Sequence, residues 1–73
     1  MFVLHCHVRS TKGEELLHTQ RHFTTQTQAY ESLERKLLAW EHAGASPVVT
    51  GLRAELTHPE YLETFTYEIK EEV

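Results

Sequence analysis

Apolar and polar side chains alternate along much of this sequence, and this alternation is the feature that most restricts its fold. A period of two residues is typical of a β-strand with one buried face, because successive side chains point to opposite sides. The alternation predicts four strands, at residues 2–9, 15–23, 48–56 and 61–70. The run from Ser10 to Gly13 is typical of a tight turn, so we expect residues 2–23 to form a β-hairpin.

The segment from Thr25 to Ala43 has the period of an α-helix instead. Its apolar residues fall within an arc of about 100°, which is the stripe of a helix laid on a core. These residues are Ala29, Tyr30, Leu33, Leu37 and Trp40. Thr25 followed by Gln28 has the form of a capping box, while Gly44 and Pro47 are typical of a helix end.

Together these elements predict an α+β two-layer sandwich, in which one helix covers one face of a four-stranded antiparallel sheet in the order β-β-α-β-β. A chain of 73 residues is long enough for one small core, so we expect residues 1–73 to form a single domain. No apolar run approaches the roughly 20 residues that cross a bilayer, and no secretory signal is present, which predicts a cytoplasmic protein without a membrane partner.

Six histidines give the sequence its most distinctive chemistry. The alternation that turns Leu4 and Cys6 inward places His5 and His7 on the opposite, solvent-facing side, together with His18. With a turn centred on Thr11 and Lys12, we expect His18 to lie opposite His5. His5, His7 and His18 are therefore a candidate site for zinc, nickel or copper, although the alternation places no carboxylate or thiolate on that face.

The same histidines allow two other interpretations. Exposed histidines on a strand are ordinary polar residues, and full protonation of all six would change the formal net charge from −4 to +2, as expected of a pH-sensitive surface. Cys6 is not expected to react, because its histidine neighbours point to the other face and supply no base. We therefore predict a small buried thiol, and a protein that is not an enzyme and holds no cofactor.

The acidic groups are concentrated near the C-terminal end, where six glutamates from Glu55 onward face one base, Lys70. An acidic rim favours a basic protein partner, including a protein that itself handles nucleic acid. The residues predicted to bind such a partner are Leu38, Glu63, Glu68, Glu71 and Glu72. The single cysteine excludes an internal disulfide, so self-association as a homodimer is a second expectation.

Direct binding of nucleic acid is the weaker alternative, because the sequence pI of about 5.8 opposes a polyanion even if Arg9, Lys12 and Arg21 gather near the first hairpin. In layout alone the chain resembles the small proteins that phages and mobile elements encode to inhibit host or defence complexes, anti-CRISPR proteins among them. That resemblance involves no diagnostic residue. Our leading prediction is thus a non-enzymatic protein-binding, inhibitory or regulatory module, with metal binding and nucleic-acid binding as alternatives.

Overall fold

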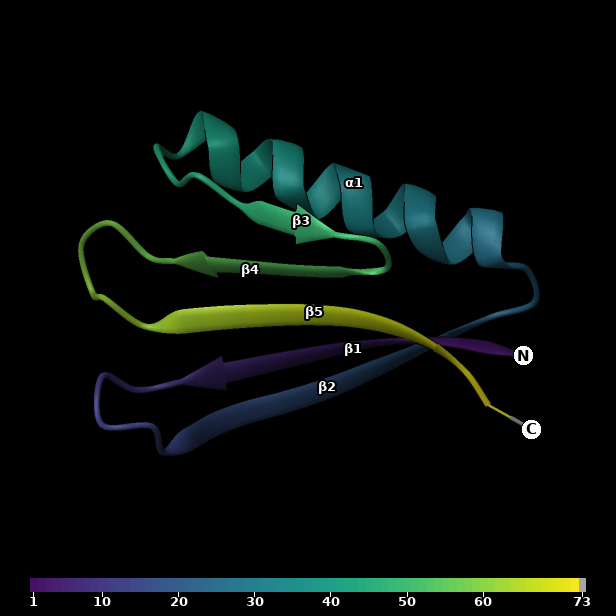
Figure 1. Cartoon of the computed structure of the whole chain (residues 1–73), viewed down its shortest axis with the longest axis horizontal. Helices are drawn as coiled ribbons and strands as arrows, with labels where there is room; N and C mark the ends of the chain where they lie inside the picture. Colours follow the sequence, from purple (N-terminus) through teal and green to yellow (C-terminus); the bar gives the residue numbers. More distant parts are fainter. Residues whose placement is uncertain (73) are drawn as a thin grey trace.

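The computed structural model describes residues 1–72, which form one helix and five strands. In chain order these are β1 (Phe2–Arg9), β2 (Glu15–Phe23), α1 (Gln26–His42), β3 (Val48–Thr50), β4 (Arg53–Thr57) and β5 (Thr64–Glu71). All strand pairs are antiparallel, in the spatial order β2-β1-β5-β4-β3. The helix lies over one face of this sheet (Figure 1). The predicted α+β sandwich with one covered face is therefore confirmed, but the predicted number of strands is wrong.

The extra strand arises because residues 48–56 do not form the single strand that was predicted. Gly51 adopts a φ of 60° in a tight turn, and Thr50 pairs with Arg53 across it. Val49 then lies opposite Ala54, whose side chain is in the core, so the turn reverses which alternate residues face the helix. The sequence pattern does not reveal this reversal, because Val48 and Val49 are both apolar and an inward position for either residue fits the pattern.

The last predicted strand, at residues 61–70, also begins later than expected. Tyr61 and Leu62 belong to the loop before β5, where Leu62 has a φ of 59°. The ring of His58 organises this loop, because its Nδ1 accepts hydrogen bonds from the backbone N–H groups of Glu60 and Tyr61. Tyr61 packs against the same ring, with 4.6 Å between ring centroids. The aromatic side chain that suggested an earlier strand start therefore contacts a loop histidine instead.

Strand β1 is central in the half of the sheet that contains the chain ends. It pairs with β2 through the first hairpin and with β5 from the other end of the sequence. The turn residue Gly13 has a φ of 85°, as the turn pattern predicted. The two ends of the described chain meet beside this strand (Figure 1), where the backbone N–H of Glu72 donates to the carbonyl oxygen of Met1 at 2.9 Å.

Helix α1 begins and ends where the sequence predicted. Thr25 is the N-cap, and both hydrogen bonds of its capping box with Gln28 are present. Ala43 is the C-cap, and Gly44 follows with a φ of 95°. Within residues 1–72 there is no helix that is both long enough and apolar enough to cross a membrane.

The core lies between α1 and the sheet, and the predicted helical stripe forms its upper layer. Leu33 is fully buried, whereas Tyr30 and Trp40 pack at the edges of the core. Trp40 also donates its indole N–H to the hydroxyl of Tyr67 at 2.9 Å, so both of these polar groups have a hydrogen-bond partner. The buried cluster comprises Leu4, Ala29, Leu33, Leu37, Ala45, Ala54, Leu56, Tyr67 and Ile69.

Two leucines of α1 test this arrangement. Leu33 has no exposed surface, so we expect Leu33→Ala to lower the free energy of unfolding by about 2–5 kcal/mol, through lost burial and a cavity. Leu38 is 55% exposed, and the matched Leu38→Ala variant is expected to change stability by less than about 0.5 kcal/mol. Urea unfolding followed by circular dichroism measures both. Equal losses for the two variants would contradict the described helix orientation.

Candidate metal centre

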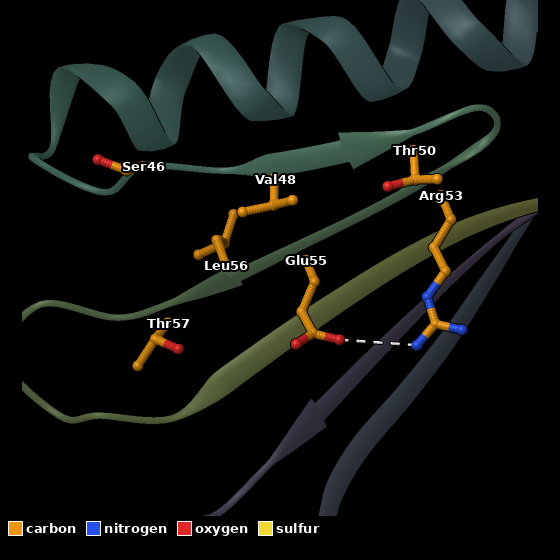
Figure 2. Close-up of a pocket in the computed structure, with 7 residues that line it drawn as sticks. All are labelled: Ser46, Val48, Thr50, Arg53, Glu55, Leu56 and Thr57. Atoms are coloured by element: carbon orange, nitrogen blue, oxygen red, sulfur yellow. Dashed lines mark ion pairs between the residues drawn. The ribbon is translucent and has the colours of Figure 1, made fainter.

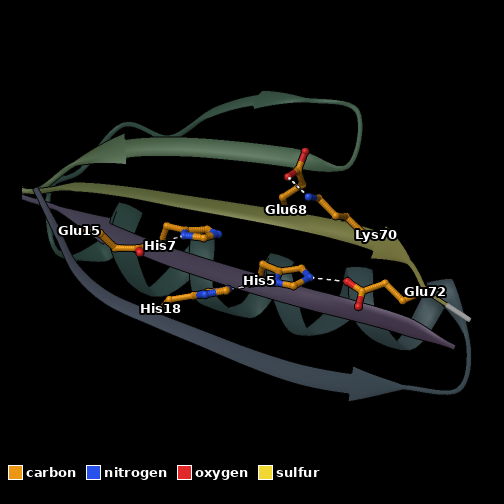
Figure 3. Close-up of polar contacts among 7 residues, drawn as sticks. All are labelled: His5, His7, Glu15, His18, Glu68, Lys70 and Glu72. Atoms are coloured by element: carbon orange, nitrogen blue, oxygen red, sulfur yellow. Dashed lines mark hydrogen bonds and ion pairs between the residues drawn. The ribbon is translucent and has the colours of Figure 1, made fainter. Parts of the chain in front are cut away.

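The candidate centre lies on the sheet face that points away from α1, which we call the open face. Phe2, Leu4 and Cys6 of β1 face the helix, so the alternate residues of the same strand lie on the open face. Figure 3 shows the side chains of His5 and His7 there, as the alternation predicted. The prediction that this face is solvent-exposed is wrong at the centre of the sheet, where His5 is only 9% exposed.

The register of the first hairpin brings His7, rather than His5, opposite His18. His5 instead lies opposite Gln20. The partner of His5 lies two residues further along β2 than predicted, because the turn spans residues 10–14 and a bulge between Glu15 and Leu17 adds one more residue. Three histidines still gather, since His5 and His7 are two residues apart on β1 and His18 lies beside them on β2.

A β-bulge at the start of β2 adds a carboxylate to this face. Val8 pairs with Leu17 but Arg9 pairs with Glu15, so Leu16 is an additional residue in β2. Without the bulge, Leu16 would be the partner of Arg9 on the open face. With it, Glu15 takes that position, and its Oε1 lies 2.5 Å from Nδ1 of His7. The expectation that no carboxylate reaches the histidines was therefore wrong.

A second carboxylate comes from the other end of the chain. Oε2 of Glu72 lies 2.6 Å from Nε2 of His5, across a sequence separation of 67 residues. Sequence reasoning placed Glu72 only in an acidic rim, because nothing in the local pattern indicates that β5 pairs with β1. Figure 3 shows the two carboxylates at opposite ends of the histidine group.

The three imidazoles form a compact cluster. Nδ1 of His5 lies 3.1 Å from Nε2 of His18, and the rings of His7 and His18 stack with 4.0 Å between centroids. One ring nitrogen from each of the three residues lies within 4.8 Å of those from the other two. Of these side chains, His5 is buried, His7 is partly buried and His18 is exposed. We refer to His5, His7 and His18 below as the histidine cluster.

The charge environment of the cluster lowers the pKa of the Glu15 carboxyl below its ordinary value. The hydrogen bond with His7 is the largest cause, and the positive charges of His7, His18 and Arg9 add to it. Desolvation is the next largest effect after the hydrogen bond and raises the pKa, but the lowering effects together outweigh it. An ionised carboxylate therefore faces the cluster over most of the pH range, which favours cations at this position.

The residues predicted to bind a protein partner do not form one surface. Leu38 lies on the exposed side of α1, and Glu63 lies in the loop before β5. Glu71 pairs with Phe2 on the helix-facing side of the sheet, whereas Glu68 pairs with His5 on the open face. Glu68 forms an ion pair with Lys70 at 3.5 Å. Only Glu72 contacts another candidate residue, and that contact belongs to the histidine cluster.

The basic residues considered for nucleic acid are also divided. Arg9 is on the open face beside Glu15, but Arg21 pairs with Leu4 on the helix-facing side. The guanidinium of Arg21 lies 5.5 Å from the centroid of the Phe23 ring. These residues therefore do not make one basic stripe of the kind that follows a phosphate backbone.

Cys6 lies on the helix-facing side, opposite Thr19 and Tyr67 of the neighbouring strands. Burial raises the pKa of its thiol, and hydrogen bonds with Tyr67 and Thr19 offset this only in part. A thiol with a raised pKa is a poor nucleophile and a poor metal ligand at neutral pH. Cys6 therefore stays outside the histidine cluster both in position and in chemistry.

Figure 2 shows a shallow hollow at the β3–β4 hairpin, with a volume of about 520 Å³. It is lined by Ser46, Val48, Thr50, Arg53, Glu55, Leu56 and Thr57. Its two charged groups neutralise each other, since Arg53 and Glu55 form an ion pair at 3.6 Å. The charges of the side chains that line the hollow therefore cancel.

Comparisons with protein families, with curated proteins and with solved structures gave no significant match. The function is therefore inferred from the geometry of the chain itself.

The contact between Glu15 and His7 can be tested by titration. We expect the pKa of the Glu15 side-chain carboxyl to lie below the ordinary value for glutamate, and His7→Ala to raise it toward that value. Because the pKa is lowered in the folded state, the contact adds stability above the ordinary pKa of glutamate and loses it as the pH falls through the lowered value. Carbon-13 NMR of the carboxyl groups measures this. An unchanged Glu15 titration in His7→Ala would contradict the contact.

Proposed function

We propose that this protein binds a transition-metal ion through the histidine cluster. The observation that carries the proposal is the convergence of three imidazoles, with one nitrogen from each within 4.8 Å of the others. Neutral imidazole is the commonest protein ligand for zinc, copper and nickel, which favours these ions over calcium or magnesium. The absence of a reactive thiol at the cluster leaves a nitrogen-rich ligand set.

The separation of two of the nitrogens supports this proposal. Metal–nitrogen bonds of about 2.0–2.1 Å at tetrahedral angles place two ligand atoms about 3.3 Å apart. The 3.1 Å between Nδ1 of His5 and Nε2 of His18 is close to that value. His7 is the ligand that has to turn, because its ring stacks on His18, and its partly exposed side chain leaves room for that rotation.

Three protein ligands leave a fourth coordination position, which at an exposed site is open to water or to a group from another molecule. His18 is exposed and belongs to β2, the outermost strand of the sheet, so this side of the cluster is accessible. We expect metal binding or metal-dependent association to be the activity of the cluster. The acidic C-terminal residues lie on different surfaces and do not form one binding site. Protein recognition by these residues stays a prediction.

Isothermal titration of tag-free protein with Zn²⁺ or Cu²⁺ tests the proposal. We expect one ion per chain, and a rise in thermal stability that corresponds to about 2.7 kcal/mol when free metal is 100 times the Kd. His18→Ala is expected to weaken binding strongly. His42→Ala, which removes an exposed imidazole at the end of α1, is expected to leave binding unchanged. Equal binding by both variants, or no binding by the wild type, would refute the proposal.

A further inference from the structure

We propose that Glu72 is a positioning residue for this metal site, and that ion binding in turn fastens the C-terminal end of β5 to β1. This inference rests on the proposed function. Glu72 does not contact the ion itself, but it determines which nitrogen of His5 can bind the ion. The His5 ring makes two side-chain contacts, one on each of its nitrogens.

The contact with Glu72 assigns the proton on His5. A carboxylate only accepts hydrogen bonds, so Nε2 of His5, at 2.6 Å from Glu72, must carry a proton and donate. The neutral ring then has its lone pair on Nδ1, which accepts a hydrogen bond from Nε2–H of His18 at 3.1 Å in the metal-free protein, so this proton of His18 is the one an ion displaces. Glu72 thus holds Nδ1 in the form that binds a metal and orients it toward the cluster.

The contact with Glu15 assigns the proton on His7 by the same rule. Its Oε1 contacts Nδ1 of His7, which assigns the proton to Nδ1 and leaves the lone pair on Nε2. Two histidines of the cluster therefore each have a carboxylate partner on one ring nitrogen and no proton on the other. A carboxylate bonded to the second nitrogen of a metal-binding histidine is a recurrent arrangement in metal sites.

The position of Glu72 links the site to the chain end. Glu72 follows the last residue of β5, and its backbone N–H bonds to the carbonyl oxygen of Met1 at 2.9 Å. Its side chain reaches along the open face to His5 (Figure 3). The side chain of His5 is only 11% exposed and that of Glu72 is 44% exposed, so a partly exposed carboxylate contacts a buried ring.

The strand register alone does not produce this contact. The residue paired with His5 on β5 is Glu68, yet the carboxylate of Glu68 forms an ion pair with Lys70 instead. Instead, Glu72, the residue after the end of β5, contacts Nε2 of His5. Because coupling between two binding events is reciprocal, a contact that strengthens metal binding is itself strengthened by the metal.

The first experiment uses metal-free protein. Nitrogen-15 NMR of the imidazoles is expected to show His5 protonated at Nε2 in the wild type, and a mixture of both neutral forms in Glu72→Ala. Glu71→Ala is the matched control, because it removes the same charge from the neighbouring residue, which pairs with Phe2 on the helix-facing side. An unchanged His5 signal in Glu72→Ala would overturn the inference, whether or not the protein binds metal.

The second experiment measures Zn²⁺ affinity. We expect Glu72→Ala to weaken binding by about 10- to 100-fold, Glu72→Gln to recover part of this loss through its amide oxygen, and Glu71→Ala to match the wild type. Added Zn²⁺ should slow hydrogen exchange at the residue 72 amide in the wild type but not in Glu72→Ala. If the wild type binds no Zn²⁺, the proposed function fails with the inference. If the wild type binds Zn²⁺ and Glu72→Ala binds it equally well, only the inference fails.

Discussion

Pairing of β1 on both of its edges is the constraint on which the rest of this structure depends. A strand held between two antiparallel neighbours has a fixed register, and a fixed register determines which side chains enter the core and which lie on the opposite face. Leu4 and Cys6 are directed beneath α1, while His5 and His7 are directed away from it. The same pairing that builds the core therefore also brings the histidine cluster together.

Much of the fold follows from the sequence because its signals are local. The capping box at Thr25, the helical stripe around Leu33 and the alternation in β1 each depend on residues a few positions apart, and the structure confirms all three. The division of residues 48–56 into β3 and β4 escaped the same reasoning. Gly51 indicates a turn only when the residues on either side are known to pair. The apolar pattern of residues 48–56 also fits one continuous strand.

The candidate site was only half predictable, for the same physical reason. The side of the sheet on which His5, His7 and His18 lie follows from the alternation of side chains along each strand. Their carboxylate partners depend on two features that this alternation does not determine. Glu15 reaches the open face because a bulge displaces the alternation by one residue, and Glu72 reaches it because the last strand pairs with the first. The sequence could predict a bulge after a glycine-containing turn, but it could not predict that the first and last strands pair.

The meeting of the chain ends beside β1 has a practical consequence for any laboratory form of this protein. Residues fused ahead of Met1 or beyond the opposite end would emerge next to the imidazoles of the open face, since Met1 and Glu72 are joined by a backbone hydrogen bond. A purification sequence rich in histidine, placed at either end, would supply rival nitrogen donors within reach of the same ions. The two ends are also close enough for a short peptide to join them, which makes a circularised chain a natural way to remove that interference.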